Sequence, residues 1–397
     1  MRASEYRLYS SLEDGLPLQK WVEIDTQALR SNYRALREHL RTRAPNARLI
    51  AVVKADAYGH GAPPCVSALL LEGCDFFAVS CIEEAIPIRR ACEALGCNAD
   101  VLVLGYTSPS LVHLLCENNI LQTLLSERYA EELAAAAEER GFCVRVHAAI
   151  DTGMNRIGFP AHSEEEILAS TKVICLLSMR KGLSIEGMYT HFADADDVEG
   201  DGAQTTHLQT ERYLHLREHL EACGVCVPFH HISNSAAFAL DEAPVLDGVR
   251  VGIILYGGHP ALHQTLPLSP VMRLKARIIH LHTLLPGECV SYGGEFSAET
   301  ERKIAVLPIG YADGLLRAYS GATVTVHTKT GDASAPIVGR ICMDQCMIDV
   351  TDSDADVGDT VTLFGDEFPV QALSKKADTI DYETLCLISA RVKRVIC

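Results

Sequence analysis

Apolar and polar positions follow two different rhythms along the chain. From residue 22 to about residue 257, short apolar, β-branched runs alternate with segments of helical period, and Gly, Asp, Ser and Asn separate them. The clearest helical patterns cover residues 127–141 and 207–224, and each ends at a glycine. We expect eight strands, at residues 49–54, 75–80, 100–105, 120–126, 144–151, 184–192, 230–233 and 249–253. This alternation predicts an α/β fold, a parallel (β/α)8 TIM barrel with functional groups at the carboxyl ends of its strands.

The rhythm changes after about residue 265, where apolar and polar residues alternate one by one. The alternation runs through KARIIHLHTL, RKIAVLPIG, ATVTVHTK, PIVGRICMDQCMIDV and DTVTLFG, with Gly and Asp turns between these segments. We therefore expect a second, all-β domain. The expected organisation is an N-terminal extension over residues 1–20, the barrel over residues 21–265 and the C-terminal β-domain over residues 266–397.

Length and charge narrow the classes of partner. The chain has 397 residues, with 35 Lys and Arg against 52 Asp and Glu, which gives a net charge of −17. Such a surface does not favour phosphate backbones or anionic lipid, so we expect neither a nucleic-acid nor a membrane partner. The N-terminal residues are polar where a signal peptide needs an apolar segment, so we expect a cytoplasmic protein.

The fifteen cysteines are an odd number, and most stand singly in apolar surroundings. This usage is typical of reduced, buried thiols rather than of disulfides. Cys223 and Cys226 form one C-x₂-C pair, but His230 and His231 are adjacent rather than at zinc-finger spacing. We expect no metal site.

A lysine stands where the first expected barrel strand ends. The segment VVKADAYGHG places Lys54 at this carboxyl end, with Tyr58 four residues further on. An amine held in an apolar wall has a lowered pKa and can bond covalently to an aldehyde cofactor. A strand-end lysine that simply extends its amine into solvent is the alternative interpretation.

The segment VVKADAYGHG resembles the pyridoxal-phosphate attachment motif of the alanine racemase family, and eight further motifs follow in that family's order. They are AAIDTGMNRIGF, EGMYTHFADAD, HISNSAAF, GVRVGIILYG, VSYGGEF, LPIGYADG, GRICMDQCMIDV and IDYETLC. The resemblance spans residues 21–397. It implies pyridoxal 5'-phosphate (PLP) as cofactor, alanine as substrate, and a homodimer with composite active sites that supplies D-alanine for peptidoglycan.

The resemblance also implies roles for five residues. Lys54 would hold PLP covalently and serve as one base, and Tyr292 of a second subunit would be the other, because a racemase needs a base on each face of a planar carbanion. Arg250 would bind the pyridine nitrogen and disfavour its protonation, which suppresses transamination. His191 would link Arg250 to the tyrosine, and Arg156 would contact the cofactor phenolate and the substrate carboxylate. From the residues alone, a packed tyrosine and a satisfied core histidine are the alternatives for Tyr292 and His191.

Further residues follow from the same resemblance. The phosphate site would draw on Tyr58, Ser235, Gly252, Ile253 and Tyr382, with Asn234 behind them. Backbone donors near Gly252 fit the phosphate-binding habit of the last two strands of a TIM barrel. The partner chain would supply Met343 to the substrate carboxylate, and Tyr311, Cys342 and Asp344 to the entrance.

One position departs from the family pattern. Many members carry a lysine two residues before the DTG motif, and its carbamate orients the arginine that contacts the cofactor. Here that position is Ala149, so no carbamate can form. Arg156 must then be held by Asp151, by Asn155 or by a bound anion.

Three rival functions use related scaffolds. A serine or serine/alanine racemase differs by one hydroxyl in its substrate, which a hydrophobic pocket rejects weakly, although the large ring of Tyr382 favours alanine. An amino-acid decarboxylase would need a carboxylate at the pyridine nitrogen, where Arg250 stands. A non-catalytic PLP carrier would lack the β-domain and Tyr292.

Overall fold

The computed structural model describes residues 18–197, 200–259 and 266–397. These residues form two compact units. One unit comprises Asp25–Val271 with Ile396–Cys397, and the other comprises Met272–Val395 with the described residues up to Ile24. Most of the expected N-terminal extension, residues 198–199 and the expected end of the barrel at residue 265 lie outside the described residues.

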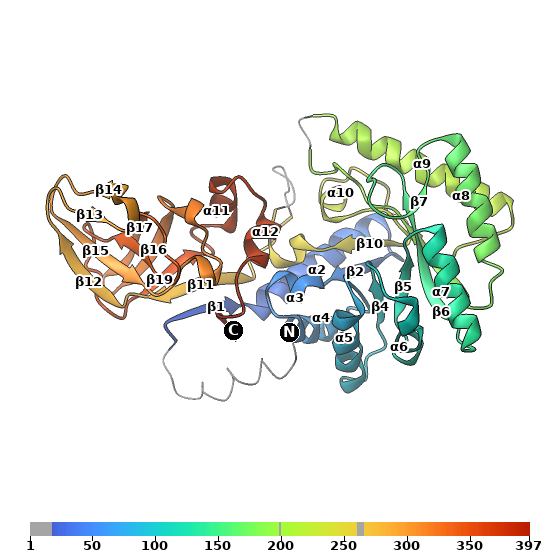
Figure 1. Ribbon diagram of the computed structural model, residues 1–397, viewed down its shortest axis with the longest axis horizontal. Helices are drawn as coiled ribbons and strands as arrows, with labels where there is room; N and C mark the ends of the chain where they lie inside the picture. Colours follow the sequence, from blue (N-terminus) through green and yellow to red (C-terminus); the bar gives the residue numbers. More distant parts are fainter. Residues whose placement is uncertain (1–17, 198–199, 260–265) are drawn as a thin grey trace. The chain divides into compact units, whose positions relative to one another are not determined.

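The first unit is a parallel barrel, seen as the blue-to-yellow half of Figure 1. Its eight strands are β2 (Arg48–Val52), β3 (Phe76–Val79), β4 (Asp100–Val103), β5 (Leu121–Leu124), β6 (Val144–Asp151), β8 (Leu183–Tyr189), β9 (His230–His231) and β10 (Gly248–Val251). The strands pair in the order β10-β2-β3-β4-β5-β6-β8-β9. Two backbone hydrogen bonds bridge the remaining gap, from Asp247 N to His230 O at 2.9 Å and from Arg250 N to Ser233 O at 3.0 Å. The predicted barrel of eight strands is confirmed.

The barrel helices follow the strands as expected. They are α2 (Thr26–Arg43), α3 (Lys54–Tyr58), α4 (Ala62–Leu71), α5 (Ile82–Ala94), α6 (Val112–Glu117), α7 (Glu127–Glu139), α8 (Glu164–Leu177), α9 (Gly202–Ala222) and α10 (Ser235–Ala239), with η1 (Pro109–Leu111), η2 (Ile253–Tyr256) and the short strand β7 (Phe159–Pro160). In α7, the Ser126 side chain caps the first turn by accepting from Tyr129 N, and Leu133 and Ala137 lie on the buried face. Local capping and apolar spacing thus define this helix where the sequence predicted it.

The second unit is built on a largely antiparallel sheet with the strand order β12-β15-β18-β17-β16-β19-β11-β1-β20. The strands are β1 (Lys20–Ile24), β11 (Met272–Arg277), β12 (His280–Leu284), β15 (Arg302–Leu307), β16 (Thr323–Thr328), β17 (Gly331–Val338), β18 (Cys346–Asp349), β19 (Thr360–Phe364) and β20 (Lys393–Ile396). The hairpin β13 (Cys289–Val290) and β14 (Phe296–Ser297), the helices α11 (Val370–Lys376) and α12 (Asp381–Cys386), and the short turns η3 (Tyr292–Gly294), η4 (Tyr311–Asp313) and η5 (Arg317–Tyr319) complete it. The expected C-terminal β-domain is confirmed.

The first strand of the described chain differs from the expected boundary at residue 21. Strand β1 pairs antiparallel with β11, with Trp21 opposite Lys275 and Ile24 opposite Met272, so it belongs to the sheet of the second unit. The apolar run WVEI indicates a strand, but the strand with which it pairs lies some 250 residues away, and no local pattern identifies that partner.

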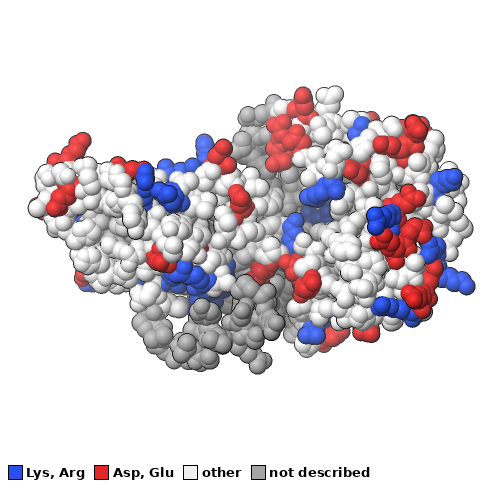
Figure 2. Space-filling view, viewed as in Figure 1, with Lys and Arg blue, Asp and Glu red and all other residues white. Residues whose placement is uncertain are grey.

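On the face that Figure 2 shows, Lys and Arg are interspersed with Asp and Glu. None of the helices within the described residues combines the length and the apolar character needed to cross a membrane.

Candidate active site

The lysine of the first motif begins an unusual turn. Lys54 follows β2 and starts α3, in which Ala55, Asp56, Ala57 and Tyr58 have φ angles of 53°, 54°, 56° and 53°. A left-handed conformation costs roughly 1–2 kcal/mol for each residue with a side chain. The surrounding structure must therefore hold this turn in place, as is common at functional sites.

Two carboxylates hold the left-handed turn. Glu84 accepts from Ala55 N at 2.7 Å and from Ser80 N at 2.8 Å, and it thereby ties the turn to the end of β3. Asp56 accepts from Ala62 N at 2.6 Å. Lys54 is thus fixed at the carboxyl end of a barrel strand, half-buried, by contacts that the sequence did not reveal.

Arg250 lies at the end of β10 and is 4% exposed. Its Nη1 donates to His231 O at 2.7 Å and to His231 Nδ1 at 2.9 Å, and its Nη2 donates to Thr190 O at 2.7 Å and to Ile232 O at 3.1 Å. Backbone carbonyls at strand ends therefore hold the guanidinium in one orientation. Burial lowers the pKa of Arg250 to about 10, so the side chain stays cationic at neutral pH.

A chain of histidines extends from this arginine into the barrel. Because Arg250 can only donate, His231 Nδ1 accepts and its proton sits on Nε2, which lies 2.9 Å from His147 Nδ1. Burial lowers the pKa of His147 to about 3, and burial together with the Arg250 charge holds the pKa of His231 well below its usual range. Both imidazoles are neutral, so the arginine is the only charge of this network. We name Arg250, His231 and His147 the arginine–histidine network.

His191 faces several cations at the same end of the barrel. Its Nδ1 lies 3.3 Å from Arg250 Nη2 and must accept, which leaves the proton on Nε2. Burial, followed by the charges of Arg250, Arg156 and Lys54, holds the pKa of His191 well below its usual range. Lys54, Arg156 and Arg250, three of the predicted site residues, thus lie close enough to His191 for their charges to act on it.

The predicted phosphate residues of the barrel also converge. A Cβ built on Gly252 would lie 2.4 Å from the Tyr58 hydroxyl, so only glycine leaves room for that hydroxyl. Gly252 N donates to Ser235 Oγ at 2.9 Å, and Asn234 caps α10 by accepting from Ala237 N at 3.0 Å. The first backbone amides of α10 and of η2, which starts at Ile253, are the donors that a phosphate group needs. Tyr382 lies on α12 of the β-domain.

The turn that carries Arg156 is held by its own backbone. Asp151 Oδ1 accepts from Gly153 N at 3.1 Å and from Asn155 N at 3.0 Å, and Asn155 Nδ2 donates to Gly153 O at 3.2 Å. Within the described ranges Arg156 is exposed and forms neither a hydrogen bond nor an ion pair. Ala149 is buried opposite Tyr189 in the β6–β8 register. The side-chain hydrogen bonds of Asp151 and Asn155 are therefore those of the turn, and Asp151 Oδ1 also lies 3.5 Å from His162 Nε2.

The predicted residues of the β-domain meet on one exposed face. Tyr292, Tyr311 and Met343 are 72%, 43% and 54% exposed. Their segments touch, because Tyr311 N donates to Cys342 O at 3.0 Å and Ser291 Oγ lies 3.4 Å from Cys342 Sγ. We call this surface, formed by Tyr292, Tyr311 and Met343, the tyrosine face.

The tyrosine face rests on a firm base. Ser291 has a φ of 65° and donates to Arg340 O at 2.6 Å, which fixes the backbone that carries Tyr292. Beneath it lies an apolar cluster that includes Val290, Ile304 and Met347 and against which Cys342 packs. Asp344 accepts from Arg391 Nη2 at 2.8 Å. The tyrosine face thus exposes large side chains on a well-anchored backbone, which is typical of a surface that contacts another molecule.

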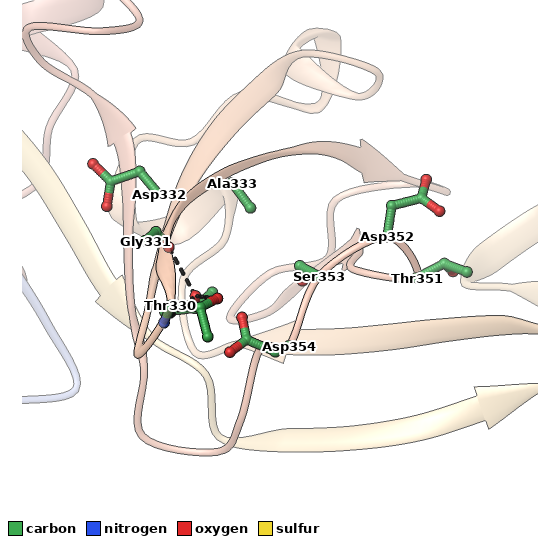
Figure 3. Close-up of a pocket in the computed structure, with 9 residues that line it drawn as sticks. Thr330, Gly331, Asp332, Ala333, Thr351, Asp352, Ser353 and Asp354 are labelled. Atoms are coloured by element: carbon green, nitrogen blue, oxygen red, sulfur yellow. Dashed lines mark hydrogen bonds between the residues drawn. The ribbon is translucent and has the colours of Figure 1, made fainter.

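A separate hollow of about 470 Å³ in the β-domain contains none of the predicted residues (Figure 3). It lies between the β16–β17 hairpin and the segment after β18, and Thr330, Asp332, Asp352 and Asp354 line it with other residues. Hydrogen bonds from Thr328 and Thr330 lower the pKa of Asp354. The Asp354 carboxyl is therefore ionised at neutral pH.

Sequence reasoning missed His147, His231 and Glu84 as parts of the site. His147 and His231 lie on buried barrel strands, and polar residues at such positions are themselves a signal of a hydrogen-bonded network. Glu84 gave no signal, because its role depends on the left-handed turn after Lys54.

Comparison with known proteins agrees with this architecture. Residues 24–260 match the family described as "Alanine racemase, N-terminal domain", and residues 271–396 match "Alanine racemase, C-terminal domain". The chain is 40% identical to the alanine racemase of Clostridium novyi (strain NT) over 385 residues, which cover 94% of each protein. It superposes on the alanine racemase of Clostridium difficile 630 with a TM-score of 0.85 and 37% identity over 96% of both chains. For the crystal structure of alanine racemase from E. faecalis the TM-score is 0.85 and the identity 33%, over 96% of this chain and 99% of that one. The chain belongs to the alanine racemase family.

Proposed function

We propose that this protein interconverts L-alanine and D-alanine with PLP as cofactor, in active sites that two copies of the chain complete together. The observation that carries the proposal is the buried cation of Arg250, held by neutral histidines and carbonyls beside Lys54 and His191. As the family resemblance implies, the enzyme would supply D-alanine for peptidoglycan.

The residues of the barrel fit PLP. The space that Gly252 leaves for Tyr58, with Ser235 and the first amides of α10 and η2, suits a phosphate group. The Lys54 amine would bond to the cofactor aldehyde, and Arg250 would meet the ring nitrogen. When bound, PLP withdraws electrons from the amino acid and makes its α-proton acidic.

Arg250 favours racemisation over the other reactions of this cofactor. A buried guanidinium disfavours protonation of the group that it contacts, because two neighbouring cations repel each other. His231 and His147 are neutral and cannot supply a proton in exchange. A carboxylate at this position would have the opposite effect, and a decarboxylase would need one. With the arginine–histidine network at its ring nitrogen, the cofactor would withdraw electrons only weakly. This favours return of the proton to the α-carbon of the substrate.

The proton would move between two bases. Lys54 would remove or return the α-proton on one face of the substrate, and Tyr292 of the partner chain would do so on the other through its hydroxyl. The neutral ring of His191 can donate from Nε2 to the oxygen of that tyrosine and stabilise its ionised form. The exposure of Tyr292 and Met343 supports their assignment to a partner's site, since both side chains are open to contact on a backbone that Ser291 anchors.

The test is a panel of L-amino acids, with alanine and serine foremost, followed by chiral analysis of the products in deuterated water. We expect D-alanine with deuterium at the α-carbon, and slower conversion of serine. An amine product would instead identify a decarboxylase, and preferential conversion of serine would change the substrate. In the same assay Lys54→Ala should lose the activity. The matched control is Lys181→Ala, which changes an exposed lysine of the barrel and should retain it.

A further inference from the structure

Three side chains of types that can bind a metal ion lie close together, one on α8 and two on α9, which are neighbouring helices of the barrel (Figure 1). Glu164 is the first residue of α8. His215 and His219 lie four residues apart on α9, so both rings project from the same face of that helix. None of the three belongs to the candidate active site.

The spacing of these groups fits a metal ion. His219 Nε2 lies 3.3 Å from Glu164 Oε1 and 3.1 Å from His215 Nε2, and His215 Nδ1 lies 3.4 Å from Glu164 Oε2. A tetrahedral zinc ion with bonds of about 2.0–2.1 Å to nitrogen and oxygen separates its ligand atoms by about 3.4 Å. One ligand atom from each side chain lies within 4.8 Å of the other two, so small side-chain rotations would place all three around one ion.

The backbones that carry the three ligands are well anchored. In α9, Tyr213 packs in the barrel and its hydroxyl donates to Met188 O at 2.7 Å, and Leu216 and Leu220 are fully buried. In α8, Ser163 caps the helix by accepting from Glu166 N at 3.3 Å. Rigid helices that present ligands at the correct spacing reduce the entropy cost of binding an ion.

We infer that Glu164, His215 and His219 bind a divalent first-row transition metal ion, of which Zn²⁺ is the representative, as a bridge between α8 and α9. Two imidazoles and one carboxylate are ligands that such ions prefer, whereas Ca²⁺ and Mg²⁺ prefer oxygen alone. All three side chains reach solvent, so water completes the coordination. The site departs from our expectation of no metal, which considered cysteine spacing and not the H-x₃-H pair at 215 and 219.

The inference is tested by titrating Zn²⁺ into the holoenzyme in a calorimeter. The exposed thiols of Cys223 and Cys226 would compete for zinc, so every protein in the series carries Cys223→Ser and Cys226→Ser. We expect one zinc ion per chain in this parent, an affinity at least about tenfold weaker with His219→Ala, and a smaller loss with Glu164→Gln. His207→Ala removes an exposed histidine of the same helix that pairs with Glu211, and it should leave the affinity unchanged.

A second measurement separates a bridge from an accidental contact. Zinc that links α8 to α9 should raise the melting temperature of the parent, and this rise should be absent with His219→Ala and present with His207→Ala. Equal zinc affinity in the parent and in the His219→Ala variant would overturn the inference, as would the absence of binding at millimolar zinc. The three residues would then be a hydrogen-bonded surface cluster only.

Discussion

The barrel and the β-domain present their predicted site residues in opposite ways. In the barrel, Arg250 is 4% exposed and His231 fully buried, and both terminal nitrogens of the guanidinium and both ring nitrogens of His231 have hydrogen-bond partners in the same unit. In the β-domain, Tyr292 is 72% and Met343 54% exposed, although the backbone beneath them is fixed. The predicted residues of the barrel are thus held by contacts within their own unit, whereas those of the tyrosine face are exposed. A second copy of the chain is the partner that our proposal supplies.

Removal of Lys54 should have the largest effect of all. In Lys54→Ala, the covalent anchor and one base disappear together, so racemisation should fall by about 10⁴-fold or more, and the visible absorbance of the bound cofactor should be lost. Enzyme assays and absorbance spectra measure both. A cofactor that borohydride still fixes to another lysine of the variant, as seen by peptide mapping, would refute the assignment.

Tyr292→Phe tests the exposed region alone. The variant removes one hydroxyl from a side chain that contributes little to the packing of its own chain, so the melting temperature should stay unchanged while kcat falls by roughly 10³-fold. Tyr106→Phe, which changes a tyrosine of the barrel that is 60% exposed, is the matched control and should retain full activity. A loss of less than about tenfold in Tyr292→Phe would remove this residue from proton transfer.

The buried histidine His147 of the barrel should make the free energy of unfolding depend on pH. The pKa of His147 is about 3 in the folded barrel and 6.5 in the unfolded chain, so the unfolded chain binds more protons as the pH falls. The contribution of His147 to stability is therefore complete above pH 6.5 and is lost as the pH falls from 6.5 towards 3. Between pH 7 and pH 5 the loss amounts to about 2 kcal/mol.

His147→Gln separates this titration from packing. Glutamine keeps an acceptor for His231 Nε2 but does not titrate, so the variant should lose about 2 kcal/mol less than the wild type between pH 7 and pH 5. Urea unfolding at a fixed protein concentration measures the difference. Parallel stability curves for the two proteins would show that His147 is not the titrating group.

The smallest effect concerns Arg156. Because Ala149 cannot be carbamylated and the polar groups of Asp151 and Asn155 serve their own turn, we expect a small anion such as chloride to orient Arg156. Replacing chloride with a bulky anion at constant ionic strength should raise KM for alanine roughly threefold, a size typical of an exposed ionic contact. Removal of bicarbonate should change nothing, and a strong bicarbonate requirement would contradict the account.

Much of the fold could be predicted from local patterns. The eight barrel strands lie where short apolar runs predicted them, and α7 begins at its Ser126 cap because capping and periodicity are local properties. The pairing of β1 with β11 could not be predicted, because a strand pattern does not specify a partner.

The candidate site likewise has parts that local sequence patterns predicted and parts that depend on tertiary contacts. Lys54, His191 and Arg250 were predicted from motifs at strand ends, and the barrel brings them together. The left-handed turn from Ala55 to Tyr58 could not be foreseen, since neither alanine nor tyrosine favours positive φ and tertiary hydrogen bonds impose it. The roles of Tyr382 and of the entrance residues stay predictions.

The most direct test of the central claim, that two chains share each active site, is complementation between two inactive variants. A Lys54→Ala chain and a Tyr292→Phe chain are given different affinity tags, mixed and exchanged, and the heterodimer is isolated by both tags and assayed for alanine racemisation. If Tyr292 serves the partner's barrel, each heterodimer contains one doubly damaged site and one intact site, so we expect about half of the wild-type activity. Verified heterodimers that remain as inactive as either parent would contradict the account and would place both residues in a site formed by a single chain.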